Sequence, residues 1–389
     1  IPPAIGNHAA VIEWDLPTRD ELHSSIQTII KNHQDRLTAI APGQNYNPSP
    51  ELAVDAVLGL SLEEAEICFT TSLQQYKRID PSLLMKKKKS VIEREKFLSW
   101  VEPDPRGMKA IGGLEILKEW AQLHRLAFEP DARSYGLPSP KGVFLFGVQG
   151  TGKSAAVKAL GNIFGLPIIK FDFGAAQSKY VGDSQANIRR GFKIIETIAP
   201  CLVWLDEIEK SLPNVGSSQG DSGVAVDQLG TFLTWQQERT APVFVAATSN
   251  NIDVLPPELM RKGRFDEIFF VDLPHTREKE EILDISLRQY NVNPETIDIT
   301  LVIGDNTPGF SGAEINALVP EAMFRAYADN KRSVRTEDLI QAARQTIPLS
   351  KTQQEKIEKL RNWAKDRARM ASKPMTTELL SSSPILDLG

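Results

Sequence analysis

The sequence predicts an α/β fold in which a mainly parallel, doubly wound sheet is covered by helices on both faces. Apolar runs of strand length alternate along the chain with stretches that have the period of amphipathic helices. The runs that read as strands are 142–146, 167–172, 201–205 and 242–247. The stretches that read as helices start at residue 155 and cover 184–198 and 225–238. This alternation is typical of parallel sheets, because a crossover between two parallel strands usually needs a helix.

A glycine-rich segment follows the strand expected at 142–146 directly. Residues 147–154 read GVQGTGKS, which fits the pattern G-x-x-x-x-G-K-[ST] between a strand and a helix. Glycines allow successive backbone N–H groups to surround a polyphosphate, and the N-terminus of the helix adds partial positive charge. We therefore expect Lys153 to reach the β- and γ-phosphates of a nucleotide and the hydroxyl of Ser154 to ligate Mg²⁺.

Two carboxylates end the strand expected at 201–205. Asp206 and Glu207 would lie at the carboxyl end of a parallel strand, where ligands of open α/β sheets bind. We expect Asp206 to hold Mg²⁺ through its water shell and Glu207 to polarise the attacking water. Together with the glycine-rich loop, this strand end predicts hydrolysis of a nucleoside polyphosphate that is bound with Mg²⁺.

Composition places the chain among globular proteins of two or three domains. The 389 residues are 41% hydrophobic and 24% charged, and the formal net charge is −5, which makes nucleic acid an unlikely main partner. Cys68 and Cys201 are far apart, so no disulfide framework is expected. No apolar run approaches the length of a membrane span. The chain begins with Ile1, so we expect a further segment upstream.

Seven motifs in combination resemble the AAA clade of the AAA+ ATPases. They are 111–113, 147–154, 180–182, 201–207, 248–250, 261–266 and 309–314. The resemblance covers 109–349 and implies a large α/β ATPase subdomain over 109–275 and a helical lid over 276–349. Three further phrases are similar to an AAA+ family encoded in cyanobacterial genomes and algal plastid genomes. These phrases are 230–235, 241–244 and 255–259.

The resemblance implies roles for single residues around a nucleotide. Asn250 matches the polar residue that orients the attacking water, and Asn251 remains an alternative because this segment has one extra residue. The residues that the resemblance places against the nucleotide are Ile111, Gly112, Gly147, Val148, Gln149, Gly150, Thr151, Gly152, Lys153, Ser154, Gly312 and Ala313.

The resemblance also implies how copies of the chain assemble and what they act on. Arg261 and Arg264 match arginines that reach a neighbour's nucleotide, where a guanidinium stabilises the charge of the transferring phosphoryl group. Such a head-to-tail contact closes into a ring or winds into a helix, and the family implies a homo-hexamer. Tyr180 and Val181 match the aromatic–aliphatic pair that grips a polypeptide in the central pore. A core tyrosine or a simple helix entry is the alternative.

Residues 1–75 repeat features of the expected lid. The stretch 1–19 resembles 255–277, and 59–64 resembles 309–314, in the same order along the chain. We infer that residues 1–75 are the C-terminal part and lid of a preceding, degenerate AAA-like module. Chance similarity between amphipathic helices is the alternative.

Charged segments flank the ATPase module. Residues 76–108 read as a charged linker helix, in which the lysine run 86–89 forms a solvated face or contacts phosphates or an anionic membrane. Residues 350–372 read as one charged C-terminal helix, and 373–389 as a disordered tail. One face of the helix is expected to dock on the module through Ile357, Leu360, Trp363 and Ala364.

These patterns favour an ATP-driven remodelling motor, in which a ring hydrolyses ATP and unfolds or remodels a polypeptide substrate through its pore. A nucleotide-controlled assembly or scaffold protein without processive unfolding is the alternative, and a nucleic-acid motor is less favoured. The family resemblance implies a location in the cytoplasm or the plastid stroma.

Overall fold

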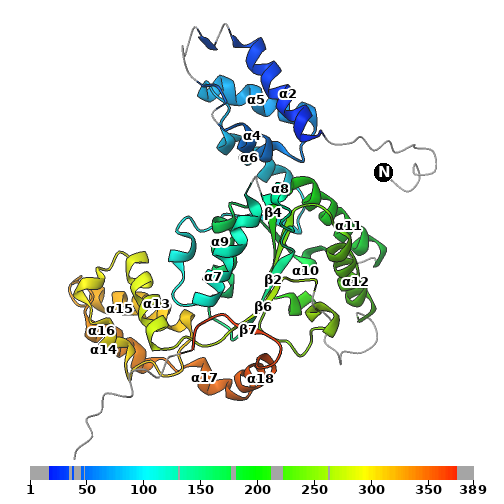
Figure 1. Cartoon of the computed structure of the whole chain (residues 1–389). Coiled ribbons are helices and arrows are strands. Elements are labelled where there is room, and N and C mark those ends of the chain that lie inside the picture. Colours follow the sequence, from blue (N-terminus) through cyan, green and yellow to red (C-terminus); the bar gives the residue numbers. More distant parts are fainter. Residues whose placement is uncertain are drawn as a thin grey trace, which may run out of the picture.

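The structure, a computed structural model, describes residues 17–34, 37–38, 45–47, 49–129, 132–176, 181–211, 222–261 and 263–374. Figure 1 shows three groups of elements: a small helical unit that comes first in the chain, a central sheet with helices on both sides, and a second helical group that follows the sheet. Within the described part of the chain, no helix has both the length and the apolar character needed to cross a bilayer.

Seven strands form one sheet in the order β1-β3-β4-β5-β2-β6-β7. They are β1 (Leu98–Val101), β2 (Gly142–Gly147), β3 (Ile168–Phe171), β4 (Cys201–Leu205), β5 (Val243–Ser249), β6 (Glu267–Val271) and β7 (Arg369–Met370). All neighbouring strands are parallel except β1, which runs antiparallel to β3. The predicted α/β fold with a mainly parallel sheet is therefore confirmed. Because β5 lies between β4 and β2, the carboxyl ends of these three strands meet at one edge.

Alternate residues of each strand face two separate cores. On β2, Val143 and Leu145 pack into one core, and Phe144 and Phe146 pack into the other. The first core is covered by α7 (Glu115–His124) and α9 (Lys153–Phe164), and the second by α11 (Val181–Ile198) and α12 (Ser222–Glu238). Figure 1 shows the two helix pairs on opposite sides of the strands. Strands buried on both faces explain why the sequence shows continuous apolar runs.

The helical group after the sheet has a core of its own. Its helices are α13 (Thr276–Gln289), α14 (Ile299–Ile303), α15 (Gly312–Ala328) and α16 (Thr336–Gln345). Leu283, Phe310, Leu318 and Leu339 are buried together between them. We refer to residues 276–345 as the lid, because this unit lies beside the sheet edge where β2, β4 and β5 end.

The first helical unit resembles the lid in its helix order and helix starts. It contains α2 (Arg19–Asn32), α4 (Pro50–Val57), α5 (Leu62–Tyr76) and α6 (Pro81–Ile92). Its first and third helices, α2 and α5, begin with a capping box, and so do the first and third helices of the lid, α13 and α15. In both units the first helix packs on the third and the second on the fourth. The origin of this unit as a degenerate lid stays a prediction.

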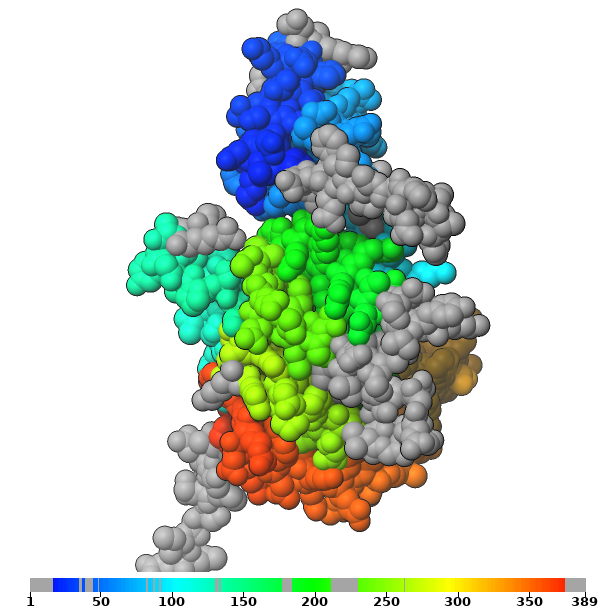
Figure 2. All heavy atoms as spheres, turned by 90° about the vertical axis from the view of Figure 1, so that its right-hand side faces the viewer, coloured from blue at the N-terminus to red at the C-terminus, as the bar shows by residue number. Residues whose placement is uncertain are grey.

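The linker expected over 76–108 is not one helix. The helix α6 ends at Ile92, and β1 then joins the edge of the sheet. The solvated interpretation of the lysine run is wrong for Lys88, which is only 1% exposed. Its ammonium donates to the carbonyl oxygens of Asp55 and Ile198, both at 2.8 Å. Lys88 therefore ties the first helical unit to the end of α11, and Figure 2 shows that unit resting on one end of the sheet domain.

The single helix predicted over 350–372 is also wrong in its second half. The chain forms α17 (Leu349–Thr352) and α18 (Gln354–Ala364) and then adds β7 to β6. The expected docking face is correct, because Leu360 and Ala364 are buried in the core of the sheet domain and Ile357 is buried as well. Trp363 packs edge-on against Phe146, with 4.9 Å between the ring centroids. Figure 2 shows this segment at the opposite end of the domain from the first helical unit.

Short helical turns complete the described elements. They are η1 (Gly107–Ala110), η2 (Arg125–Phe128), α8 (Ala132–Tyr135), α10 (Phe173–Ala176), η3 (Ile208–Ser211), η4 (Pro257–Met260) and η5 (Pro294–Thr296).

Candidate functional site

The glycine-rich loop lies between the end of β2 and the start of α9, beside a cavity of about 470 Å³. Gly152 precedes the first residue of α9 with a φ of +91°, and a side chain added there would meet open space. Among the residues that the structure describes, no side chain caps this helix. The first N–H groups of a helix have no partners within it, so those of α9 are free to bind an anion. A volume of this size suits a nucleotide-sized ligand.

Lys153 lies inside the glycine-rich loop. Its side chain is 6% exposed, and its ammonium donates to the carbonyl oxygens of Gly147 (3.1 Å) and Val148 (2.6 Å). Burial lowers the pKa of Lys153 to about 8, and the carboxylates of Glu209, Glu207 and Asp206 oppose this shift. A negatively charged ligand in this site therefore stabilises the protonated, charged form of Lys153.

The two carboxylates after β4 are held by hydrogen bonds from neighbouring strands. The hydroxyl of Thr248 donates to Oδ1 of Asp206 at 2.9 Å, and the Lys170 ammonium donates to Oδ2 of Asp206 at 2.8 Å. The backbone N–H of Glu207 donates to the Thr248 hydroxyl at 2.9 Å. Glu207 has a φ of +48°, which is uncommon for a residue with a side chain and is often found at functional sites.

Asn250 lines the cavity beside the two carboxylates. Its amide Nδ2 donates to Oε1 of Glu207 at 2.7 Å, and its backbone N–H donates to Oε1 of Glu209 at 2.8 Å. The side chain of Asn251 points into a turn, where its Oδ1 accepts from the N–H of Asp253 at 3.1 Å. Of the two alternatives, the structure therefore places Asn250 in the site.

The lid forms the opposite wall of the cavity. The backbone N–H of Ala313, in the first turn of α15, donates to the carbonyl oxygen of Gly150 at 2.8 Å. On the other side, a side chain at Gly112 would lie 2.7 Å from Ile282 of α13. Glycine is therefore needed at residue 112 for the loop to pack so closely on the lid.

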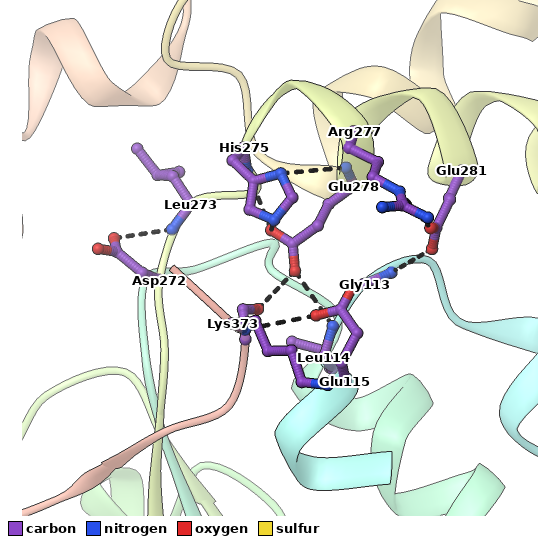
Figure 3. Close-up of polar contacts among 11 residues, drawn as sticks. Gly113, Leu114, Glu115, Asp272, Leu273, His275, Arg277, Glu278, Glu281 and Lys373 are labelled. Atoms are coloured by element: carbon purple, nitrogen blue, oxygen red, sulfur yellow. Dashed lines mark hydrogen bonds and ion pairs between the residues drawn. The ribbon is translucent and has the colours of Figure 1, made fainter. Parts of the chain in front are cut away.

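A buried carboxylate joins the lid to the loop that lines the cavity. Glu278 of α13 is 3% exposed and accepts from the backbone N–H of Leu114 (3.1 Å) and from that of His275 (3.0 Å). It also accepts from the hydroxyl of Ser372, in the segment that follows β7. Figure 3 shows the loop, the lid helix and the C-terminal segment converging on this carboxylate. We call this set of bonds the hinge network.

The hinge network also brings together three groups that can ligate a metal. One ligand atom from each of Glu115, His275 and Glu278 lies within 4.8 Å of the other two. Both oxygens of Glu278 already accept hydrogen bonds, and Nδ1 of His275 accepts from the N–H of Glu278 at 3.4 Å. These bonds account for the cluster, so we interpret it as part of the hinge.

Most of the residues predicted to bind a nucleotide line the cavity. They are Ile111, Gly112, Gln149, Gly150, Thr151, Gly152, Lys153, Ser154, Gly312 and Ala313, joined by Asp206, Glu207 and Asn250. Gly147 and Val148 are not in the lining, and their carbonyl oxygens hold Lys153 instead. The remaining residues of the lining were not predicted. They are Asp104, Arg106, Ala110, Ala155, Thr248, Ile282, Ile285, Ser286, Gln289 and Asn316.

The predicted arginines lie away from the cavity of their own chain. Arg261 is 71% exposed and makes a loose ion pair of 4.0 Å with Glu258, and neither Arg261 nor Arg264 is in the lining. The Arg264 guanidinium donates to the carbonyl oxygen of Glu258. The predicted pore residue Tyr180 and the side chain of Val181 lie outside the described residues.

Comparisons with known proteins agree with this geometry. The family described as "ATPase family associated with various cellular activities (AAA)" matches residues 143–273. The "Uncharacterized AAA domain-containing protein ycf46" of Trieres chinensis is 36% identical over 379 residues, which are 96% of this chain and 73% of that protein. The protein of the same name in Guillardia theta is 37% identical over 377 residues, which are 96% of this chain and 72% of that protein.

A more distant relative has an ATPase name. The "Peroxisomal ATPase pex6" of Schizosaccharomyces pombe is 29% identical over 299 residues, which are 74% of this chain and 30% of that protein. The long matches to the ycf46 proteins, together with the AAA match over the sheet, decide the family. The chain belongs to the ycf46 family of AAA domain-containing proteins and is an ATPase.

Proposed function

We propose that the cavity between the glycine-rich loop and the lid binds and hydrolyses Mg·ATP, and that a ring of copies uses this reaction to remodel a polypeptide. The observation that carries the first part is the set of hydrogen bonds among Thr248, Asn250, Asp206 and Glu207 beside the uncapped start of α9. These bonds fix two carboxylates at the place where the terminal phosphate of a bound nucleotide would end.

The residues that line the cavity suit a triphosphate. The free N–H groups at the start of α9 bind the phosphate oxygens, and Lys153 moves from the loop carbonyls to the negative charge. Ser154 and Asp206 provide the hydroxyl and carboxylate oxygens that Mg²⁺ prefers. Mg²⁺, when bound, neutralises part of the charge that develops on the phosphate oxygens. Ile111 and Gly112 on one side and Gly312 and Ala313 on the other enclose the base.

Glu207 is the proposed general base, and Asn250 holds its carboxylate in place. The 2.7 Å bond from Nδ2 of Asn250 to Oε1 of Glu207 leaves Oε2 of Glu207 with the exposed ammonium of Lys210 as its partner. A water molecule beside this carboxylate loses a proton as it attacks the terminal phosphate. Glu207→Gln keeps the side-chain volume but removes the base. We expect this variant to retain bound nucleotide and to lose phosphate release, and hydrolysis at the wild-type rate would disprove the assignment.

The position of the arginines supports a ring. Arg261 stands on the surface, outside the cavity of its own chain, so it can complete only the site of another copy. A contact that joins different surfaces of two copies repeats around an axis, and it forms a closed ring or an open helix. We propose a homo-hexamer, in line with the family, in which Arg261 and Arg264 stabilise the transition state of the neighbouring subunit.

The proposed substrate is a polypeptide held in the pore by Tyr180 and Val181. The support is the family relationship and the start of α11 at Val181, directly after Tyr180. An unfolded polypeptide should stimulate the ATPase, and Tyr180→Ala should abolish the stimulation while the basal rate remains. Tyr135→Ala is a matched control, because Tyr135 is 84% exposed on the surface. Equal stimulation of all three proteins would contradict the role of Tyr180. ATP-dependent association with slow turnover and no unfolding of a test protein would instead favour a nucleotide-controlled assembly or scaffold protein.

The first helical unit and the cellular location complete the proposal. We propose that this unit is the lid of a degenerate preceding module, supported by its helix order and by capping boxes at Ser61 and Ser311. In the lid, α15 begins with Gly312 and Ala313. The matching helix of the first helical unit, α5, begins with the bulkier Leu62 and Glu63. Algal relatives are encoded in plastid genomes, which supports the plastid stroma or the cytoplasm as the location of this protein.

A further inference from the structure

Glu209 is a third carboxylate beside the candidate site, and the sequence motifs assign it no role. It lies in the turn η3, directly after the strand end that carries Asp206 and Glu207. Its Oε1 accepts the backbone N–H of Asn250 at 2.8 Å. Its Oε2 is buried and has no hydrogen-bond partner within the described part of the chain. A buried carboxylate oxygen without a hydrogen-bond partner is costly, so its presence calls for an explanation.

Glu209 is linked to the proposed base, Glu207, through Asn250. The Asn250 side chain donates to Glu207, while the Asn250 backbone N–H donates to Glu209. The two acidic residues therefore hold the same asparagine from its two ends. If the bond to Glu209 is lost, the backbone at residue 250 is free to turn, and the amide no longer lies within hydrogen-bond distance of Glu207.

A second explanation is that Glu209 serves as a counter-charge. Among the charges near Lys153, the carboxylate of Glu209 has the largest favourable effect on the ammonium. This effect depends on the negative charge of Glu209 alone. The bond to Asn250 depends on an acceptor oxygen, which glutamine also has. The Glu209→Gln variant therefore separates the two explanations.

We propose that Glu209 is a positioning residue for ATP hydrolysis: through the N–H of Asn250 it keeps the asparagine amide on Glu207. This inference rests on the proposed roles of Glu207 and Asn250. It gives Glu209 no contact with nucleotide, in keeping with its absence from the residues that line the cavity. The loss of Glu209 should therefore lower kcat and leave the affinity for ATP unchanged.

The test compares Glu209→Gln with Glu209→Ala in steady-state ATPase assays and in binding assays with a fluorescent ATP analogue. Glu209→Ala should lower kcat by about tenfold to a hundredfold, because a displacement of about 1 Å in a catalytic constellation has an effect of this size. Its Kd for the analogue should change less than twofold. Glu209→Gln should keep most of the wild-type kcat. Glu209→Met, which fills the same space without an acceptor, replaces the alanine variant if that protein does not fold.

A double-mutant cycle decides whether Glu209 acts through Asn250. In an Asn250→Ala background the amide is absent, so Glu209→Ala should cause no further loss of kcat. Additive losses, an equal loss in the glutamine and alanine variants, or a full kcat in the alanine variant would each overturn the proposal. Failure of the proposed function is a separate result: the wild-type protein would show no ATPase, or Glu207→Gln would retain it.

Discussion

Glu278→Ala should both weaken the fold and open the nucleotide cavity. The carboxylate is 3% exposed and accepts the N–H groups of Leu114 and His275, together with the hydroxyl of Ser372. Leu114 is itself only 5% exposed, so its N–H lies in the protein interior and depends on this carboxylate for its hydrogen bond. The variant therefore loses several hydrogen bonds to a charged acceptor and leaves buried donors without partners.

The size of the effect follows from these contacts. A hydrogen bond to a charged group contributes about 1.5 to 3 kcal/mol, and a buried donor without a partner costs about 1 to 3 kcal/mol. Because these two effects overlap for the same bonds, we expect the free energy of unfolding to fall by about 3 to 5 kcal/mol. Glu281→Ala is the matched control. Glu281 is about two-fifths exposed and accepts one backbone N–H, from Gly113 at 2.9 Å, so its loss should cost about 1 kcal/mol.

Denaturant unfolding gives the change in free energy, and a fluorescent ATP analogue gives the change in affinity. In the Glu278 variant, amide hydrogen exchange at residues 111–114 should become faster and the affinity should fall, because this loop lines the cavity. The Glu281 variant should show a small change in both. If the two variants lose the same free energy, or if Glu278→Ala loses less than about 1 kcal/mol, the role of the hinge network is refuted.

Three further predictions concern charge. Burial lowers the pKa of Lys153 to about 8, so the fraction of protonated lysine in the free protein falls about tenfold from pH 7 to pH 9. The Kd for ATP should rise by the same factor, and Lys153→Met should remove this pH dependence. Burial likewise lowers the pKa of Lys88 to about 8 in the folded protein, whereas the pKa of this lysine in the unfolded chain is 10.5. Between pH 8 and 9.5 the unfolded state therefore binds more protons than the folded state. Over this range the free energy of unfolding should rise by about 1.5 kcal/mol more in the wild-type protein than in Lys88→Met. Finally, mixing equal amounts of Glu207→Gln and of the Arg261→Ala, Arg264→Ala double variant should restore about one quarter of the wild-type rate. In randomly mixed rings, about one quarter of the head-to-tail contacts join a subunit with an intact Glu207 to a neighbour with intact arginines. A mixture as inactive as its components would refute the action of the arginines on a neighbour.

Local patterns were sufficient to predict the parallel sheet and most of the cavity. The glycine-rich loop and the strand end at Asp206 are continuous segments, so their residue types reveal their chemistry. Three strands were not predicted: β6 and the edge strands β1 and β7. The edge strands, with four residues and two residues, are too short to show a period of two. Pairing with β3 and β6 creates these strands, and this pairing depends on the folded sheet.

Long-range contacts explain the other differences. Lys88 belongs to a run of four lysines, and only the packing of α6 against α4 and α11 makes it a buried residue. Thr248 and Lys170 reach Asp206 because β5 and β3 are the two neighbours of β4, an order that no single segment encodes. A polar residue at a strand end was the available signal for Thr248. Lys170, in an otherwise apolar strand, was the signal for an ion pair at this strand end.

The lid contacts imply that nucleotide affinity and lid position are linked. The cavity is closed by Gly150 against Ala313 and by Gly112 against Ile282, so a lid that turns away removes one wall of the site. A ligand that binds the closed arrangement more tightly must stabilise it by the same free energy. The hinge network acts on this equilibrium from outside the cavity, because Glu278 holds the loop to the lid without lining the site. Binding and lid closure should therefore weaken together in the Glu278 variant, whereas loss of Glu209 should slow hydrolysis with the lid in place.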